Sequence, residues 1–485
     1  MLPVNTIDIL KNLSKNELKR LGDFIYSPYF NSKESIHELY NEVVKNHPDF
    51  KPEKFDYEKI YKKIYGEENY KKQTIKNLYS QFGALLKKFI AHERIEANQA
   101  DFNKALLSGL TDKKCFELSN KIISVLKKEK DKLVLTEDEQ FFYTYYLESA
   151  YSDNLSSLDF SNLDIVHQQY NAISNNLIFY FLDVFFFFTI QDAVLTKAYK
   201  VKKDMDVIKK NFLKSFNGDE FFKNENDKYY PASLKIRYLA YMYSENEITE
   251  DEFKKFEELI IQNIDGFTAQ FKIYCWAILE RTILLKLIPK DKKYYEDAFR
   301  INNYFFNLKI FPNNFISIIP KSIIRDSISV AMVLKKFEWA ENFIYYSYSY
   351  MNEDTREDEM NYCMGRLSFQ RKKYEESIGY LSKVKFQQID EKINVRFYYL
   401  MNYIELKSYQ SALSMLNSTR QFYLESKELP EMFAVLIESS IKFFREIIKA
   451  EENNKKVDFA ILKEAENAGR YYQKQYIISK LKTLV

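Results

Sequence analysis

Apolar and aromatic residues recur along the chain at spacings of three and four residues, as on one face of a helix. The stretch 374–384 shows this most clearly, with spacings of four, three and three between Tyr374, Ile378, Leu381 and Val384. A polar run at 370–373 precedes it, and before that run an apolar set stands at Tyr362, Leu367 and Phe369. The pattern predicts two antiparallel helices joined by a tight turn.

A lysine-bearing turn, an aromatic residue and, three positions later, a small residue occur together four times. The aromatic residues are Tyr295, Phe337, Tyr374 and Tyr409. The small residues are Ala298, Ala340, Ser377 and Ala412, which lie 42, 37 and 35 positions apart. A repeated helical hairpin explains this near-regular period. Because aromatic residues make up 17% of the chain, an irregular helical bundle in which such pairs recur by chance stays the alternative.

Residues 285–425 resemble the tetratricopeptide repeat, a helical hairpin with a period of about 34 residues. The family places Gly or Ala twelve positions before the small residue, and Gly365 stands there in one copy. The other copies depart from the pattern at this position, with Lys286, Ile328 and Leu400, and the fourth apolar position of the first copy is Asn302. The resemblance implies an all-α fold in which hairpins stack into an α-α superhelix.

Tetratricopeptide-like arrays bind peptides or helices along a concave groove that is lined by the first helix of each hairpin. The resemblance implies such a groove here, without a cofactor or a metal. Carried over by position, it would be lined by Tyr362, Arg366 and Phe369 from one hairpin and by Phe397, Met401 and Glu405 from the next. The alternative is that the aromatic residues among these six belong to the core.

We expect three regions along the chain. Residues 1–100 form a small helical module, residues 101–285 form hairpins with degenerate repeats, and residues 286–485 form the repeat-like hairpins with C-terminal capping helices. Capping boxes predict three helix starts, at Ser14 with Glu17, at Thr136 with Glu139 and at Thr249 with Glu252.

The C-terminal cap is expected to be two helices that cover the last apolar face of the array. Pro430 suits the first turn of a helix that begins at Glu431. Asp458 is placed to cap a final helix over 459–481.

The sequence S-P-Y-F-N at 27–31 predicts a compact corner after the first long helix, because a residue before proline avoids the helical region. This opening is similar to the N-terminal part of uncharacterised proteins from Bacteroidetes-type bacteria, which carry the same corner. The resemblance implies no activity.

Composition supports helices joined by short turns. The 485 residues include 9 Gly and 9 Pro, whereas average usage would give about 34 Gly. The net charge of +3 arises from 72 basic and 69 acidic residues, so no overall field favours nucleic acid or membranes. Three widely separated cysteines, Cys115, Cys275 and Cys363, fit a reducing cytoplasm.

The most apolar stretch, 177–190, is expected to be a buried helix, too short to span a bilayer. Asp183 lies within it. A charge in such surroundings pairs with another group or has a raised pKa. Asp183 is therefore either a general acid or partner anchor, or a polar edge paired with a lysine from a neighbouring helix, and we favour the second interpretation.

Several kinds of catalytic site are excluded by spacing. The two closest glycines, Gly365 and Gly379, are fourteen positions apart, whereas phosphate-binding loops need clustered glycines. The four histidines, His37, His47, His92 and His167, show no zinc-ligand spacing. His167 is interpreted as a packed or surface histidine. We therefore predict no catalytic residue, no metal and no cofactor.

The favoured hypothesis is a non-enzymatic scaffold of a bacterial cytoplasm that binds a protein or peptide, with no membrane partner and no small-molecule substrate. The alternative is a nucleic-acid-associated regulator that uses residues 1–100, where 17 basic and 14 acidic residues are interleaved. An enzyme that uses carboxylates such as Asp183 is least favoured, because the sequence shows no accompanying base, nucleophile or metal pair.

Overall fold

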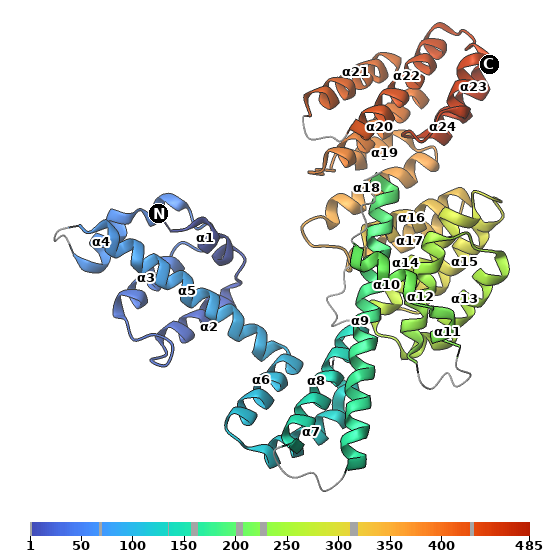
Figure 1. The fold of residues 1–485 in the computed structure, drawn as a ribbon. Helices are drawn as coiled ribbons and strands as arrows, with labels where there is room; N and C mark the ends of the chain where they lie inside the picture. Colours follow the sequence, from blue (N-terminus) through green and yellow to red (C-terminus); the bar gives the residue numbers. More distant parts are fainter. Residues whose placement is uncertain are drawn as a thin grey trace. The chain divides into compact units, whose positions relative to one another are not determined.

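The computed structural model describes residues 2–66, 70–133, 135–156, 163–199, 207–223, 230–310, 319–426 and 431–485. Over these residues it contains 24 α-helices and no strand, which confirms the all-α prediction (Figure 1). The chain divides into two compact units. Unit 1 comprises Met1–Val134 and Phe142–Asn176, and unit 2 comprises Leu135–Phe141 and Leu177–Val485. The predicted boundaries at 100 and 285 stay predictions.

Unit 1 begins with short helices around a common core and continues with longer ones. They are α1 (Val4–Lys11), α2 (Lys15–Tyr26), α3 (Glu34–Val44), α4 (Tyr57–Tyr65), α5 (Lys72–Ala97), α6 (Gln99–Asp112) and α7 (Phe116–Glu129). Two further helices, α8 (Glu137–Ser156) and α9 (Leu163–Tyr199), contribute residues to both units.

The predicted start of α2 and the corner that follows it are confirmed. Ser14 accepts a hydrogen bond from the backbone of Glu17, whose side chain accepts from the backbone of Ser14, so the capping box is complete. In the corner, the amide nitrogen of Asn31 donates to the carbonyl of Ile25 at 3.2 Å. Phe30 stacks on Phe24 at 3.9 Å between ring centroids, which anchors the corner to the core of unit 1.

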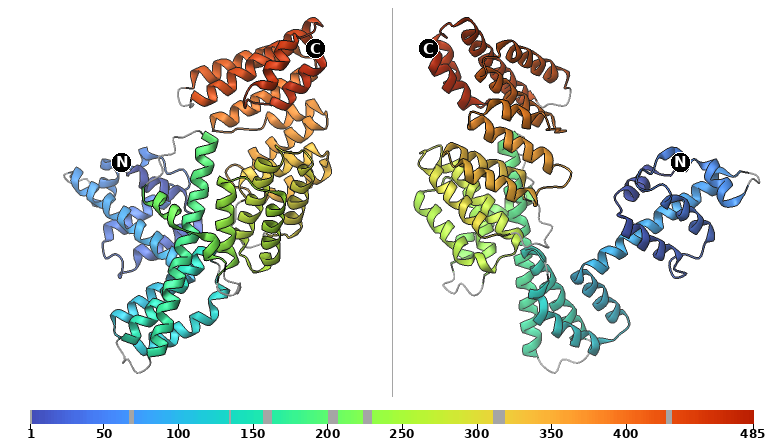
Figure 2. Two further views of the ribbon diagram at one scale, coloured as in Figure 1. Left: turned by 45° about the vertical axis from the view of Figure 1, so that its right-hand side comes forward. Right: turned by 180° about the vertical axis from the view of Figure 1, so that it is seen from behind.

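Unit 2 is a succession of helices, most of which pack in consecutive pairs. It contains α10 (Val207–Ser215), α11 (Gly218–Phe221), α12 (Ala232–Glu245), α13 (Glu250–Asn263), α14 (Ala269–Thr282), α15 (Tyr294–Asn307), α16 (Lys321–Val333), α17 (Phe337–Tyr348), α18 (Arg356–Gln370), α19 (Tyr374–Leu381), α20 (Ile389–Glu405), α21 (Tyr409–Glu425), α22 (Glu431–Asn453), α23 (Phe459–Asn467) and α24 (Lys474–Leu484). From α14 to α22 each helix packs against the next. Figures 1 and 2 show that the helices from α12 to α17, which are coloured green to yellow, lie side by side.

The hairpins also share one pattern of longer contacts. Helices α16, α18 and α20 are the first helices of three consecutive hairpins, and α16 packs against α18 as α18 packs against α20. This sequential packing is consistent with a helical repeat, as the 3.6-residue periodicity and the regular turns predicted.

Three of the four lysine-bearing turns share one backbone conformation, and the turn before Tyr295 differs, because Lys293 lies in the right-handed helical region with a φ of −53°. Lys335, Lys372 and Lys407 have positive φ values of 58°, 62° and 58°, in the left-handed region that usually favours glycine. The residue after each donates its backbone N–H to a carbonyl five positions earlier, as from Lys373 to Ser368 at 2.9 Å. The equivalent donor atoms in the other two turns lie 2.8 Å from their acceptors. In these three copies the lysines of the sequence thus mark a recurring helix-ending turn.

The four small residues of the repeat pattern, Ala298, Ala340, Ser377 and Ala412, are fully buried. Around Ser377 the helices come into close contact. Its hydroxyl donates to the carbonyl of Gly365 at 2.7 Å and accepts from the amide of Asn402 at 2.9 Å. A Cβ on Gly365 would lie 2.8 Å from Cγ of Leu381, so α18 and α19 cross where only glycine fits.

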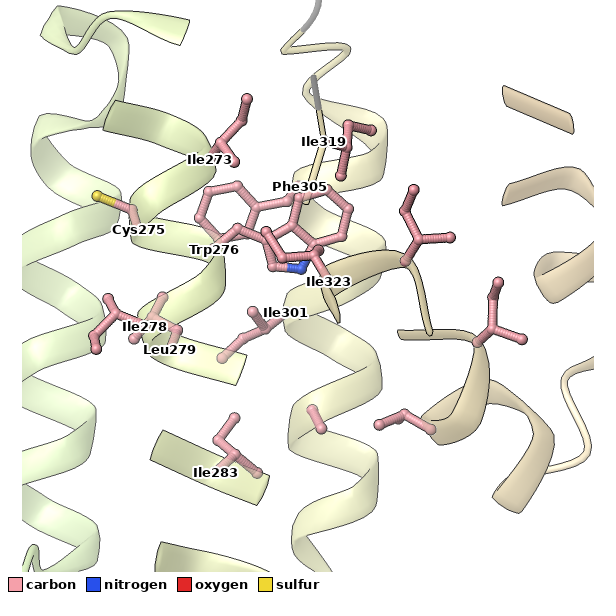
Figure 3. Close-up of a cluster of buried hydrophobic side chains, with 14 of the residues drawn as sticks. Ile273, Cys275, Trp276, Ile278, Leu279, Ile283, Ile301, Phe305, Ile319 and Ile323 are labelled. Atoms are coloured by element: carbon pink, nitrogen blue, oxygen red, sulfur yellow. The ribbon is translucent and has the colours of Figure 1, made fainter. Parts of the chain in front are cut away.

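The core around α14 explains why the apolar pattern fails at Asn302. Figure 3 shows Trp276 and Phe305 within this cluster of buried side chains, and their rings stack at 5.7 Å. Asn302 is fully buried there and accepts a hydrogen bond from the indole nitrogen of Trp276 at 2.7 Å. A buried polar residue that has its partner is tolerated in a core, although the sequence pattern alone counts it as a break.

Helix α9 differs from its prediction. It has 37 residues, which corresponds to about 55 Å at 1.5 Å per residue, so the argument that the apolar stretch is too short to span a bilayer is wrong. Its portion Asp164–Ala193 is long and apolar enough to cross a membrane by length and composition, a test that core helices of soluble proteins also pass. In the most apolar 18-residue segment of this helix, only 28% is buried. One side packs inward through Leu182 and Phe186, while Phe188 is 63% exposed.

The C-terminal region also differs in part. Helix α22 is described from Glu431 onward, and Pro430, on which its predicted start depends, lies outside the described residues. Asp458 accepts from the backbone of Ala460 at 2.8 Å, which confirms the predicted cap. The single helix predicted over 459–481 is wrong, because the chain leaves the helix after Asn467 and begins α24 at Lys474.

Candidate functional site

Most of the six predicted groove residues lie in the core of unit 2. Phe397 and Met401 are at most 1% exposed, and Tyr362 and Phe369 are 6% and 8% exposed. This burial favours the interpretation that they are core residues, and their use by a partner stays a prediction.

The two charged members of the set are partly exposed and have internal partners. Arg366 donates from Nε to the hydroxyl of Tyr398 at 3.2 Å and from Nη2 to Ser329 at 2.6 Å. Glu405 accepts from the hydroxyl of Tyr476 at 2.8 Å and lies 3.0 Å from the amine of Lys480. Contact with a partner at these two positions would compete with the internal bonds.

An ion network that sequence reasoning missed connects the three first helices. Arg325 of α16 donates to both carboxylate oxygens of Glu359 of α18, at 2.9 and 2.5 Å, and to Glu391 of α20 at 2.9 Å. Lys321 adds a 2.5 Å bond to Glu391. Burial raises the pKa of Glu359, whereas the hydrogen bonds from Arg325 lower it. The spacing in the sequence could have indicated this pair, because Arg325 and Glu359 are 34 positions apart, which is one repeat period.

A pocket of about 450 Å³ lies among α9, α12, α14, the start of α16 and the start of α8, all in unit 2. We call it the Arg237 pocket. Its wall contains three acids, two arginines and several aromatic residues: Glu137, Asp138, Asp183, Arg237, Arg281, Phe187, Phe188, Phe271 and Tyr274.

Arg237 lies at the centre of this wall and is 8% exposed. Its Nε donates to Oδ1 of Asp183 at 3.2 Å. The centre of the guanidinium group lies 3.8 Å from the ring centroid of Tyr274 and 4.9 Å from those of Phe187 and Phe271. Aromatic faces attract a guanidinium cation, so three rings and one carboxylate fix its position.

The interpretation of Asp183 as a paired residue is confirmed, with an arginine in place of the expected lysine. Burial raises the pKa of Asp183, whereas the charge and the hydrogen bond of Arg237 lower it. The 54 positions between the two residues left no pattern in the sequence from which the partner could be identified. His167 is exposed, which agrees with a surface histidine.

Glu137 fixes a second edge of the pocket. Its carboxylate accepts from the backbone nitrogen of Thr268 at 2.8 Å and from the Thr268 hydroxyl at 2.7 Å. Burial raises the pKa of Glu137, and the two bonds from Thr268 lower it. Since Thr268 also caps α14, these bonds hold the first turn of α8 against the start of α14.

Chemically, this arrangement can bind a polar group against aromatic walls. Among the described residues, no group of three or more His, Cys, Asp and Glu is placed to hold a metal ion. Comparison of the chain with protein-family models, with curated proteins and with solved structures found no match in any of the three.

Proposed function

We propose that the chain is a non-enzymatic scaffold that binds another protein in a bacterial cytoplasm, and that its C-terminal hairpins form a tetratricopeptide-like superhelix. The observation that carries this proposal is the regular succession of hairpins, in which the first helices α16, α18 and α20 also pack against one another. Stacked hairpins of this kind present an extended surface without needing a catalytic pocket. The three widely separated free cysteines support a reducing compartment.

Exposed charges on the first helices are the proposed contact points. Asp326 of α16 is exposed. Neighbouring helices displace part of the water around its carboxylate, and this desolvation raises the pKa of Asp326, while the charges of Arg366, Arg281 and Arg325 lower it. Asp326 is thus surrounded by arginines of α14, α16 and α18. A charged group of a partner can replace one of these arginines as its counterion, and such charge pairs contribute more to the specificity of binding than to its affinity.

The test is affinity capture of the tagged full chain from a lysate of its own cells, with bound proteins identified by mass spectrometry. We expect a reproducible partner whose recovery falls in the Asp326→Lys variant. The matched control is Glu258→Lys, the same charge change at an exposed position of α13. Circular dichroism confirms that both variants fold.

Two results would contradict this proposal. One is recovery of no protein above an empty resin, and the other is equal loss of the partner in both variants. If the chain instead stays on immobilised DNA or RNA and its retention falls steeply as salt rises, the nucleic-acid alternative gains support.

A further inference from the structure

A groove of about 620 Å³ in unit 2 is lined by cations and, among the described residues, by no acid. It lies between the end of α19, the connection that follows α19, and one face each of α20 and α21. Its charged residues are Lys385, Lys392 and Arg396, which give the lining a formal charge of +3. Lys385 and Ser418 are exposed, so the groove is open to solvent. We call it the Arg396 groove.

Helix geometry and two contacts fix the position of Arg396 in this groove. Lys392 and Arg396 are four positions apart and therefore lie on the same face of α20. Arg396 donates from Nη1 to the hydroxyl of Ser418 of α21 at 2.7 Å. The centre of its guanidinium group lies 4.7 Å from the ring centroid of Phe422. A positive charge is thus held at the groove before any ligand binds.

The three cations make no ion pair within the described part of the chain. Desolvation lowers the pKa of Arg396, and no neighbouring carboxylate opposes this effect. In α15, by contrast, the hydrogen bond to Glu257 raises the pKa of Arg300. The carboxylate of Asp358 accepts from the backbone nitrogen of Lys385 at 2.8 Å, but Asp358 does not line the groove. Because a charge that is partly withdrawn from water is stabilised by a counterion, the groove favours an anion as its occupant.

The floor of the groove suits an apolar group beside that anion. Val384, Val395 and Met415 supply this apolar surface. An inorganic anion would leave the floor in water, whereas an acidic side chain next to an apolar one contacts both the floor and the cations. The floor is less suited to single-stranded nucleic acid, which stacks its bases on exposed rings. The aromatic residues of the groove, Phe386 and Tyr399, are buried and half-buried.

We propose that the Arg396 groove binds an acidic segment of the protein partner, in which Asp or Glu residues stand next to apolar residues. The carboxylates pair with Lys385, Lys392 and Arg396, and the apolar side chains cover the floor. A protein segment as the occupant rests on the proposed scaffold function. The groove then selects partners by charge, because it attracts acidic segments and repels basic ones.

The test uses the full-length chain and a short fluorescein-labelled peptide that alternates Glu and Leu, with binding followed by fluorescence anisotropy. We expect a dissociation constant on the order of 0.1–1 mM, which rises with salt concentration. The same peptide with Gln in place of Glu should bind at least about tenfold more weakly. Arg396→Gln should weaken binding of the Glu peptide about three- to tenfold. Arg420→Gln, the same change at an exposed position of α21 outside the groove, should leave binding unchanged.

Circular dichroism confirms that the variants fold, and Lys385→Gln, at an exposed position, replaces Arg396→Gln if that variant does not. Absence of binding of the Glu peptide to the parent would overturn the proposal. Equal binding of the Glu and Gln peptides would do so as well, as would equal affinity of the Arg396→Gln and Arg420→Gln variants for the Glu peptide. Tighter binding of a single-stranded RNA of the same length would overturn a protein segment as the occupant. Since the peptide is a probe, a capture experiment that fails while the peptide still binds would refute only the scaffold function.

Discussion

Glu280 of α14 is an acid in a fully packed core, 2% exposed. Its Oε1 accepts from the amide of Asn302 at 2.8 Å and from the hydroxyl of Ser327 at 2.9 Å. Burial raises the pKa of Glu280 to about 8, the charge of Asp326 raises it as well, and the two hydrogen bonds lower it. The carboxyl group is therefore largely protonated in the folded protein near neutral pH.

We expect Glu280 to make the free energy of unfolding depend on pH. Its folded pKa of about 8 lies above the ordinary value of 4.5, so the folded state binds this proton more tightly than the unfolded state. The stabilisation is complete below pH 4.5 and is lost as pH rises through 8. Glu280→Gln keeps the acceptor without a charge. It should therefore gain stability relative to the parent as pH rises from 5 to 8, by at most about 1.4 kcal/mol per pH unit.

Urea denaturation of both proteins across that pH range measures the effect. The Glu258→Gln change, at an exposed position of α13, serves as the control for the loss of a surface carboxyl group. A difference between Glu280→Gln and the parent that stays constant from pH 5 to 8 would contradict the raised pKa.

Single residues also show where sequence reasoning reached its limit. Periodicity counts Asn302 only as a failure of the apolar pattern. It cannot show that Trp276 and Glu280 of α14 and Ser327 of α16 converge on one place. Asp183 was correctly interpreted as paired, since a charge in an apolar helix needs a partner. Its partner, Arg237, follows only from three-dimensional packing.

At the scale of the element, the hairpin formed by α18 and α19 was predicted because its turn, its periodicity and its glycine all agreed. Gly365 is the only one of these signals that depends on close packing. A Cβ there would lie 2.8 Å from Cγ of Leu381 and 3.4 Å from the carbonyl oxygen of Ser377. The backbone of α19 cannot move away without breaking the Ser377 bond to Gly365.

Gly365→Ala should therefore destabilise the protein by up to about 2 kcal/mol, because the strain of overpacking, about 1–3 kcal/mol, exceeds the gain in helix propensity of about 1 kcal/mol. The chain offers a matched control in α19, where a Cβ on Gly379 would meet no atom within 4 Å. Gly379→Ala should stabilise by up to about 1 kcal/mol. Urea denaturation at fixed pH measures both. If the two variants shift stability in the same direction, the close crossing of α18 and α19 is not the constraint at Gly365.

The C-terminal helices and α9 were predicted less well, because their sequences lack such agreement between turn, periodicity and glycine. The break between α23 and α24 is held by Tyr471, which is 5% exposed and donates from its hydroxyl to the carbonyl of Ala465 at 3.0 Å. The predicted cap at Asp458 marked where this segment begins, but the prediction used no signal for an end before 481. The prediction for α9 covers only the apolar stretch 177–190, whereas the helix extends beyond this stretch on both sides.

At the scale of the whole molecule, the sequence predicted an all-α chain correctly, because scarce glycine and proline and a 3.6-residue periodicity point the same way. Function could not be predicted in the same manner, since the features that distinguish this chain join separate hairpins. The ion network of Lys321, Arg325, Glu359 and Glu391 is the clearest, because it connects three first helices through side chains that each hairpin alone would leave unpaired.

This network leads to a prediction about how the hairpins depend on one another. Arg325→Met removes the shared cation and leaves Glu359, 4% exposed at its side chain, without its main partner. Removing one member of a buried ion pair lowers the free energy of unfolding by about 3–5 kcal/mol. Because the side chain of Arg325 is 21% exposed, solvent screens part of this interaction, and we expect a smaller loss of about 2–3 kcal/mol.

Adding Glu359→Gln to Arg325→Met removes the stranded charge, so the double variant should be more stable than the sum of the two single losses, by about 1–2 kcal/mol. Lys321 remains to pair with Glu391. Urea denaturation of the two single variants, the double variant and the parent gives this coupling energy directly. If the losses in the free energy of unfolding are additive, the charges of one hairpin contribute to stability independently of those of the next. Coupling would instead show that neighbouring first helices stabilise one another through the network, as expected for an array in which each unit depends on the next.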